Sequence, residues 1–152
     1  MGFFSFNKKA GKKVLPTVEP AAPPAQSAQK KAEALLAYVK GLGLPYQNVL
    51  IMVQGDDVIL KGDVDKQSDS ERIVLAVGNV EGVDKVDNQM KVKTPAPEAR
   101  YHTVAEGDWL SKIAQTYYGD AKKFDVIFEA NKPMLKDPDE IYPGQVLRIP
   151  NL

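Results

Sequence analysis

The chain has 152 residues, in which 20 Lys and Arg residues balance 20 Asp and Glu residues, so no global electric field favours nucleic acid. It contains no cysteine and a single histidine, His102, which excludes disulfides, thiolate metal ligands and sites built from several histidines. No serine-centred motif, phosphate loop or metal cluster accompanies His102, and we therefore expect a binding protein and not an enzyme.

Residues 1–26 form an N-terminal arm that continues into a linker rich in Pro and Ala. Aromatic residues come first and lysines follow: Phe3, Phe4, Phe6, then Lys8, Lys9, Lys12 and Lys13. Three possibilities stay open for this arm. Its aromatic side chains dock on the protein's own core, it lies on a membrane surface, or it is a frayed, solvated terminus. The composition from Pro16 to Gln29 predicts an extended linker without a helix.

The sequence shows no targeting segment. The apolar start of the chain ends at Asn7, too early for a secretory signal, and no stretch approaches the roughly 20 apolar residues of a membrane span. We therefore expect a cytoplasmic protein with no transmembrane segment.

Residues 27–93 predict an α+β domain with the order α-β-β-α-β and both helices on one face of the sheet. Ser27 is the expected N-cap of the first helix, whose apolar residues recur at helical spacing up to the stop signal at Gly41: Ala32, Leu35, Leu36 and Val39. Gly55-Asp56 predicts a hairpin turn between two strands. Ser68 and Glu71 form a predicted capping box for the second helix, and 83–92 is the expected third strand.

Four carboxylates surround these strands: Asp56, Asp57, Asp63 and Asp65. They raise the possibility of a calcium site, but they do not fit the spacing of a calcium loop. Because turns favour Asp for local reasons, a solvated edge is the preferred interpretation.

A glycine-bracketed turn, Gly78 to Val83, follows the second helix. Glycines let the backbone turn sharply and point successive carbonyl groups the same way. Converging carbonyl groups can replace the hydration shell of a monovalent cation. For the residues of the turn alone, an ordinary helix C-cap is the preferred interpretation, because Gly ends a large share of helices. The surrounding pattern, Val58-x-Leu60-x-Gly62-x-Val64 and then Val80-Glu81-Gly82-Val83-x-x-Val86-x-Asn88, resembles the BON domain.

A short Pro-rich linker, 94–99, leads to a second predicted domain, 100–152, with the order β-α-α-β. Asp108 is the expected cap of its first helix, which ends at Gly119. Asn131 is predicted to end the second helix in a left-handed conformation. Pro143-Gly144 predicts a type II turn before the closing strand.

This domain is similar to the LysM module in three segments: Tyr101-x-Thr103-Val104-x-x-Gly107-Asp108-x-Leu110-x-x-Ile113-Ala114, Ile127-x-x-Ala130-Asn131, and Ile141-Tyr142-Pro143-Gly144-Gln145-x-Leu147-x-Ile149-Pro150. The resemblance implies a groove that binds N-acetylglucosamine chains of peptidoglycan or chitin. One wall of this groove would be Gly107, Asp108, Trp109 and Leu110, and the other Asn131 and Ile141, Tyr142, Pro143 and Gly144. Trp109 stands where the family has Thr or Ser, so its indole either stacks on a sugar or packs inward.

A BON domain followed by a LysM domain, with Met1-Gly2-Phe3-Phe4-x-Phe6 at the start and 129–136 near the end, resembles a family of bacterial cytoplasmic potassium-binding proteins. The resemblance implies a small, monomeric K⁺ sensor linked to the stress response, which prefers K⁺ and larger alkali ions over Na⁺ and becomes more compact when bound. It also implies ligation by backbone carbonyl groups of the turn and the arm: Gly78, Val80, Gly82, Val83, Asn7 and Ala10. The LysM domain would then be a surface for an unidentified protein partner. The alternative is a peptidoglycan-binding envelope protein.

Overall fold

The computed structural model describes residues 2–7, 9–14, 24–46 and 48–151. A first module contains β1 (Gly2–Ser5), α1 (Pro24–Leu42), β2 (Asn48–Gln54), β3 (Asp57–Lys66), α2 (Gln67–Gly78), β4 (Lys85–Asn88) and β5 (Lys91–Thr94). A second module contains β6 (Arg100–Thr103), α3 (Leu110–Tyr118), a 3₁₀ turn (Ala121–Lys123), α4 (Phe124–Ala130) and β7 (Val146–Ile149). The α+β fold class predicted from the sequence is confirmed.

The first module is built on one mixed sheet with the strand order β1-β4-β3-β2 and with β5 also paired to β3. Strands β2 and β3 form an antiparallel hairpin around the predicted Gly55-Asp56 turn. The expected single strand 83–92 is instead two strands, β4 and β5, which pair in parallel with successive parts of β3. The break falls where the buried Asn88 side chain turns back to accept the amide of Met90 and donates to Ser70.

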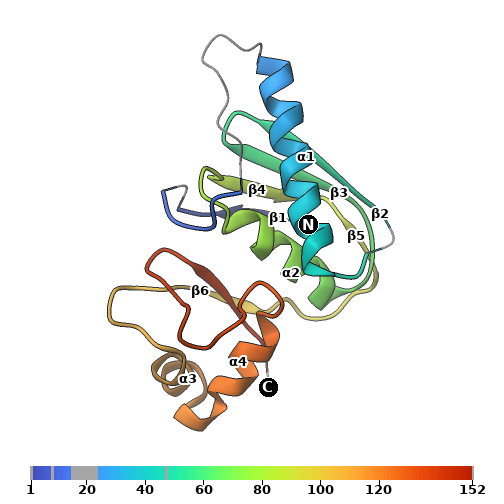
Figure 1. The fold of residues 1–152 in the computed structure, drawn as a ribbon. Helices are drawn as coiled ribbons and strands as arrows, with labels where there is room; N and C mark the ends of the chain where they lie inside the picture. Colours follow the sequence, from blue (N-terminus) through green and yellow to red (C-terminus); the bar gives the residue numbers. More distant parts are fainter. Residues whose placement is uncertain (1, 8, 15–23, 47, 152) are drawn as a thin grey trace.

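Both helices of the first module contact one another and cover the same face of the sheet, as predicted (Figure 1). Helix α1 begins at Pro24, so the expected N-cap Ser27 lies inside it, and the predicted extended linker is wrong for residues 24–29. Proline fits the first helical position because its missing amide hydrogen would have no partner there. The rest of the predicted linker, 15–23, lies outside the described residues.

Helix α2 lies between the sheet and the second module (Figure 1), contacting β3 and β4 on one side and β7 on the other. Almost every residue from Asp69 to Gly78 is therefore buried. The predicted capping box is wrong, because the N-cap is Lys66 without a side-chain cap bond. Ser68 lies in the first turn, and Glu71 makes contacts with the second module.

The second module has the predicted β-α-α-β order, with β6 and β7 antiparallel and both helices packed on them. Gly119 ends α3 in the left-handed region at φ 72°, as expected. The predicted left-handed stop at Asn131 is wrong, since its φ is −108°. The amide of Gln145 donates to the carbonyl oxygen of Tyr142 at 3.1 Å, and Gly144 has φ 90°, as the predicted type II turn requires.

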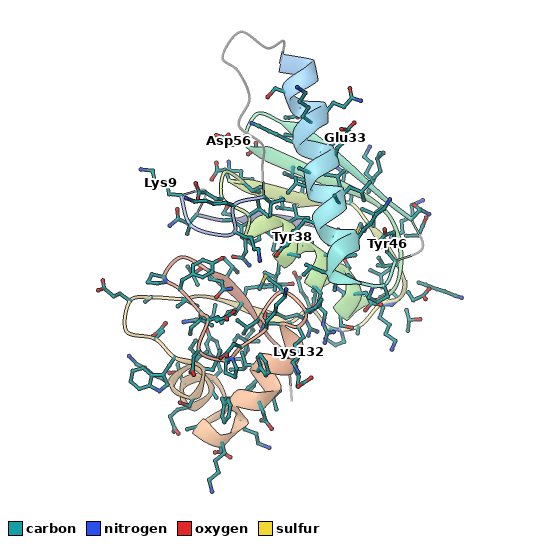
Figure 2. The ribbon with its side chains drawn as sticks, in the orientation of Figure 1. Lys9, Glu33, Tyr38, Tyr46, Asp56 and Lys132 are labelled. Carbon is teal, nitrogen blue, oxygen red and sulfur yellow. The ribbon has the colours of Figure 1, made fainter. Side chains whose placement is uncertain are left out.

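The arm is docked on the first module over its described residues. Strand β1 pairs antiparallel with β4, and Phe6 is buried, at 8% exposure. The ring of Phe4 meets Tyr101 of the second module edge-on, with 5.2 Å between centroids. Lys9 points outward from the arm (Figure 2). Of the three possibilities for the arm, docking on the core is therefore the one observed. No helix in the described part of the chain is both long and apolar enough to cross a bilayer.

Candidate cation site between the arm and the turn

The turn after α2 is wound tightly by its own backbone. The amide of Val80 donates to Val77, and the amide of Val83 donates to the carbonyl oxygen of Val80 at 3.1 Å. Gly82 has φ 99°, a value that side chains rarely tolerate. A glycine is therefore needed at this position to close the turn and start the approach to β4.

The arm lies directly against this turn. The amide of Lys12 donates to Asn79 at 3.0 Å, and the amide of Glu81 donates back to Lys12 at 2.8 Å. Phe6 fixes the other end, because its amide donates to Asp84 at 2.7 Å and its ring covers Gly78. A Cβ atom at Gly78 would overlap with that ring. The structure therefore brings the two parts of the predicted site together.

Main-chain oxygen atoms are available in both parts. The carbonyl groups of Gly78, Gly82, Val83 and Ala10 accept no hydrogen bond from the described residues. Those of Val80 and Asn7 each accept one, from the amides of Val83 and Ala10, and a carbonyl oxygen keeps a second lone pair. The described residues contain no group of three or more His, Cys, Asp or Glu that could hold a metal ion. Among these residues, a cation therefore finds backbone oxygen ligands and no carboxylate cluster.

The second module covers the arm from the opposite side. The space beside Gly144 is filled by Asn7 and Ala10. Tyr142 donates its hydroxyl to the carbonyl oxygen of Asn79 at 3.4 Å. Burial raises the pKa of Tyr142 to about 12, with a smaller contribution from Tyr38. Tyr142 and Gly144, which the sequence assigns to a glycan groove, thus face the first module.

Asn79 joins the two modules and was missed by the sequence analysis. Its side-chain oxygen accepts the amide of Val146 at 2.8 Å, and its side-chain nitrogen donates to the carbonyl oxygen of Val146 at 2.8 Å. The residue is 6% exposed. The only sequence feature that could have identified Asn79 is its position between Gly78 and Val80 in the predicted turn.

The predicted glycan-binding residues separate into different environments. Trp109 is 57% exposed and lines a cavity of about 210 Å³ together with Leu110, Phe124, Pro138 and Asp139. Gly107 and Pro143 are exposed, and Ile141 is half-buried against the module's own core. Asn131 is buried, and its side chain bonds the backbone of Arg148 on β7 in both directions. The structure therefore groups Trp109 and Leu110 but not Asn131, Tyr142 or Gly144 with them.

Asp108 does not cap α3, which corrects the expectation from the sequence. The N-cap is Trp109, without a side-chain cap bond. The Asp108 carboxylate instead accepts the amide of Ala105 at 2.9 Å and contacts His102 Nε2 at 2.9 Å. These two hydrogen bonds, the backbone one first, lower the pKa of Asp108.

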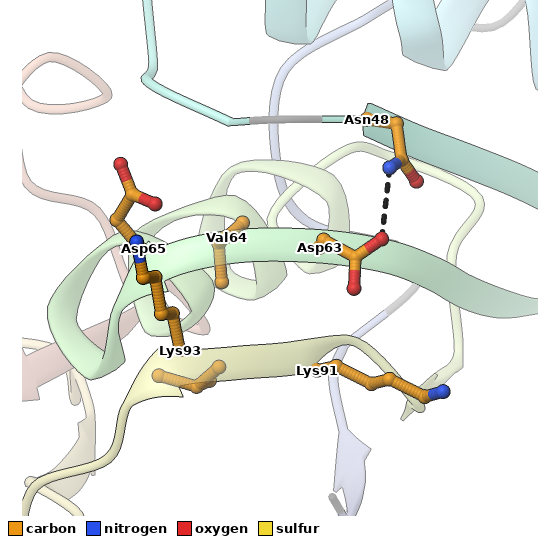
Figure 3. Close-up of a pocket in the computed structure, with 7 residues that line it drawn as sticks. Asn48, Asp63, Val64, Asp65, Lys91 and Lys93 are labelled. Carbon is orange, nitrogen blue, oxygen red and sulfur yellow. Dashed lines mark hydrogen bonds between the residues drawn. The ribbon is translucent and has the colours of Figure 1, made fainter.

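A larger cavity, about 410 Å³, lies along β3 and β5 on the first module (Figure 3). Asp63 and Asp65 line it together with Lys91 and Lys93, and Asn48 donates to Asp63 at 2.8 Å. All four carboxylates considered for calcium are exposed. The mixed charge of this cavity agrees with a solvated edge.

Comparison with known proteins gives the same two domains in the same order. The BON domain model matches residues 24–94, and the LysM domain model matches residues 102–150. The chain is 43% identical over 151 residues to "Potassium binding protein Kbp" of Escherichia coli, covering 99% of both chains. It is 36% identical over 131 residues to an uncharacterized protein of Deinococcus radiodurans, covering 78% of this chain and 51% of that protein.

Proposed function

The chain belongs to the family of BON–LysM proteins that includes the potassium binding protein Kbp of Escherichia coli, and we propose that it binds K⁺. The ion is held by backbone carbonyl groups of the BON turn and of the arm: Gly78, Val80, Gly82, Val83, Asn7 and Ala10. The observation that carries this proposal is the docking of the arm on the turn through Phe6 and Lys12, the latter by two hydrogen bonds.

The chemistry of these groups suits a large, weakly hydrated ion. Neutral carbonyl dipoles replace the hydration shell of K⁺, and their number and field strength discriminate against Na⁺. A site made of the backbone also depends on how closely the arm is held to the turn. We therefore propose preference for K⁺ and larger alkali ions, with the ion stabilising the docked arm and the compact arrangement of the chain.

The biological role we propose is that of a monomeric cytoplasmic sensor or buffer of K⁺, linked to the stress response. BON and LysM are binding modules, and we propose binding in place of catalysis. In this role, the exposed part of the LysM domain is free to contact a protein partner.

Thermal unfolding tests the proposal. A ligand that binds only the folded state raises its stability by mass action. The melting temperature should rise more in KCl and RbCl than in NaCl at equal ionic strength. Superimposable melting curves in the three salts would refute K⁺ binding, since ionic strength alone acts equally in all of them.

A second candidate function is binding of N-acetylglucosamine chains by the LysM domain. It is favoured by the exposed indole of Trp109 beside a cavity that also contains Phe124, because aromatic faces stack on sugar rings. Retention of the folded protein on purified peptidoglycan sacculi would support this function. Full recovery in the unbound fraction would remove it.

A further inference from the structure

Gly144, in the LysM domain, is in close contact with the arm. A Cβ atom built on Gly144 would lie 3.0 Å from the Cβ atom of Ala10 and 3.0 Å from the side-chain nitrogen of Asn7. Carbon atoms in favourable contact stay about 3.5–4.0 Å apart. Any side chain at this position would therefore push the arm toward the BON turn or the LysM turn away from the arm.

The turn that carries Gly144 is held firmly. The amide of Gly144 donates to the carbonyl oxygen of Val104 at 2.8 Å, and the amide of Gln145 closes the turn by donating to the carbonyl oxygen of Tyr142. Val146 lies two residues after Gly144, and the side chain of Asn79 holds its backbone by two hydrogen bonds. The LysM turn is therefore anchored both to its own domain and to the BON turn, so the arm is the part that yields.

The arm is thus enclosed between two turns from different domains. On one side Lys12 bonds the backbone of Asn79 and Glu81 in the BON turn. On the other side Asn7 and Ala10 meet Gly144. Asn7 and Ala10 are also the arm residues whose carbonyl groups take part in the proposed cation site. The distance from these carbonyl groups to the ion therefore depends on the LysM domain.

We propose that the Tyr142–Gly144 turn of the LysM domain is the outer wall of the cation site, and that Gly144 is a positioning residue that sets how closely the arm approaches the ion. This inference rests on the proposed K⁺ binding. It gives the LysM domain a direct part in ion selectivity. A side chain at 144 presses the arm a few tenths of an ångström toward the BON turn, which narrows the space for the ion and disfavours the larger Rb⁺ more than K⁺.

The test is a calorimetric titration of the full chain with KCl and with RbCl. We expect Gly144→Ala to weaken Rb⁺ binding about tenfold and K⁺ binding less, which moves the ratio of the two affinities toward K⁺. The matched control is Gly119→Ala, because Gly119 is also a LysM glycine with positive φ, 72°, and nothing lies within 4 Å of its added Cβ atom. Both variants strain the LysM backbone, but only Gly144→Ala touches the arm, so Gly119→Ala should keep the wild-type ratio.

A rescue variant separates contact from strain. Ala10→Gly removes the methyl group that the new side chain at 144 would meet, and it keeps the carbonyl group of residue 10. In the Gly144→Ala background it should restore part of the Rb⁺ affinity and return the K⁺/Rb⁺ ratio toward that of the wild type. If Gly144→Ala fails to fold, Ala10→Val enlarges the same contact from the arm without altering the LysM domain, and we expect the same shift.

The outcomes distinguish the two proposals. Wild-type protein that gives no heat with either salt contradicts K⁺ binding itself. Wild-type protein that binds K⁺, with Gly144→Ala or Ala10→Val showing an unchanged K⁺/Rb⁺ ratio, leaves the ion site in place and overturns the LysM wall. An equal change of the ratio in Gly119→Ala also overturns it, because that variant does not contact the arm.

Discussion

Glu71 in the BON domain and Arg148 in the LysM domain, 77 residues apart in the chain, form a buried ion pair. Arg148 Nε donates to Glu71 Oε1 at 2.6 Å, and the side chains are 12% and 2% exposed. The second carboxylate oxygen of Glu71 accepts the amide of Ala99, just before β6, at 3.2 Å. A single carboxylate on α2 thus holds both strands of the LysM domain against the BON domain.

Removing one partner of this pair should destabilise the folded chain. Glu71→Ala leaves the guanidinium group of Arg148 without its counter-charge, which typically costs about 3–5 kcal/mol at a buried site. We expect the double variant Glu71→Leu/Arg148→Leu to lose clearly less, because it buries no unpaired charge. Urea unfolding of both variants measures the two free energies. An equal loss in the single and double variants would show that the charge balance does not matter.

The partner of Glu71 could not be predicted from the local sequence pattern. The local pattern Ser68 to Glu71 fits a capping box, and the helix was correctly expected nearby. Glu71 instead finds a stronger partner on β7, which no spacing rule connects to it. The available signal was that α2 is apolar on more than one face around Glu71, with Ile73, Val74, Leu75 and Val77 all buried. A carboxylate in a helix covered on both sides needs a partner from another element.

Asn79 should be more important for domain docking than for the fold of either domain. Asn79→Ala removes two hydrogen bonds and leaves the buried amide and carbonyl groups of Val146 without partners, at a cost of about 1–3 kcal/mol for each unsatisfied group. We expect faster hydrogen exchange at the amide of Val146 and a larger radius of gyration in X-ray scattering.

Asn131→Ala is the matched control for this prediction. Asn131 holds Arg148 by an equivalent pair of hydrogen bonds, but entirely within the LysM domain. It should lower the stability of that domain without separating the two domains at low temperature. An equal increase of the radius of gyration in Asn79→Ala and Asn131→Ala would mean that Asn79 has no special role in holding the two domains together.

The candidate site was predicted in part. The turn and the arm were identified from their sequence pattern and their resemblance to a family, and the structure brings them together through Lys12, Asn79 and Glu81. The contact of Gly144 with Asn7 and Ala10 was not predicted. It depends on the relative position of two domains, whereas Pro143-Gly144 by itself indicates only a turn. Sequence patterns describe neighbours along the chain, and this contact joins residues from opposite ends of it.

The turn offers a direct comparison between backbone and side chain. Gly82→Val places a branched side chain at φ 99° and should distort the carbonyl groups on both sides. Glu81→Ala removes a carboxylate and keeps the backbone path. We expect K⁺ affinity in calorimetry to fall about tenfold or more for Gly82→Val and to change little for Glu81→Ala. The reverse order would indicate a carboxylate site.

Tyr142 gives a prediction at high pH. Its pKa in the folded chain, about 12, is higher than the roughly 10 of an unfolded tyrosine. The folded state therefore holds this proton more tightly. The resulting stability is fully present below about pH 10 and is lost as the pH rises toward 12. Tyr142→Phe should remove this part of the alkaline loss of stability, as followed by urea unfolding across the pH range. An unchanged alkaline slope would contradict burial of the phenol against Asn79.

Trp109 separates the two candidate functions. Its side chain is 57% exposed and lies under the ammonium group of Lys112, 5.3 Å from the ring centroid. Because an exposed side chain far from core contacts changes stability by only about 0.5 kcal/mol, Trp109→Ala should fold normally. Among the described residues, those that line the cavity beside Trp109 all belong to the LysM domain, and none of them belongs to the arm. We therefore expect unchanged K⁺ binding in calorimetry, together with loss of any retention on peptidoglycan sacculi. Reduced K⁺ affinity in Trp109→Ala would place the ion on the LysM domain and contradict the site between the arm and the BON turn.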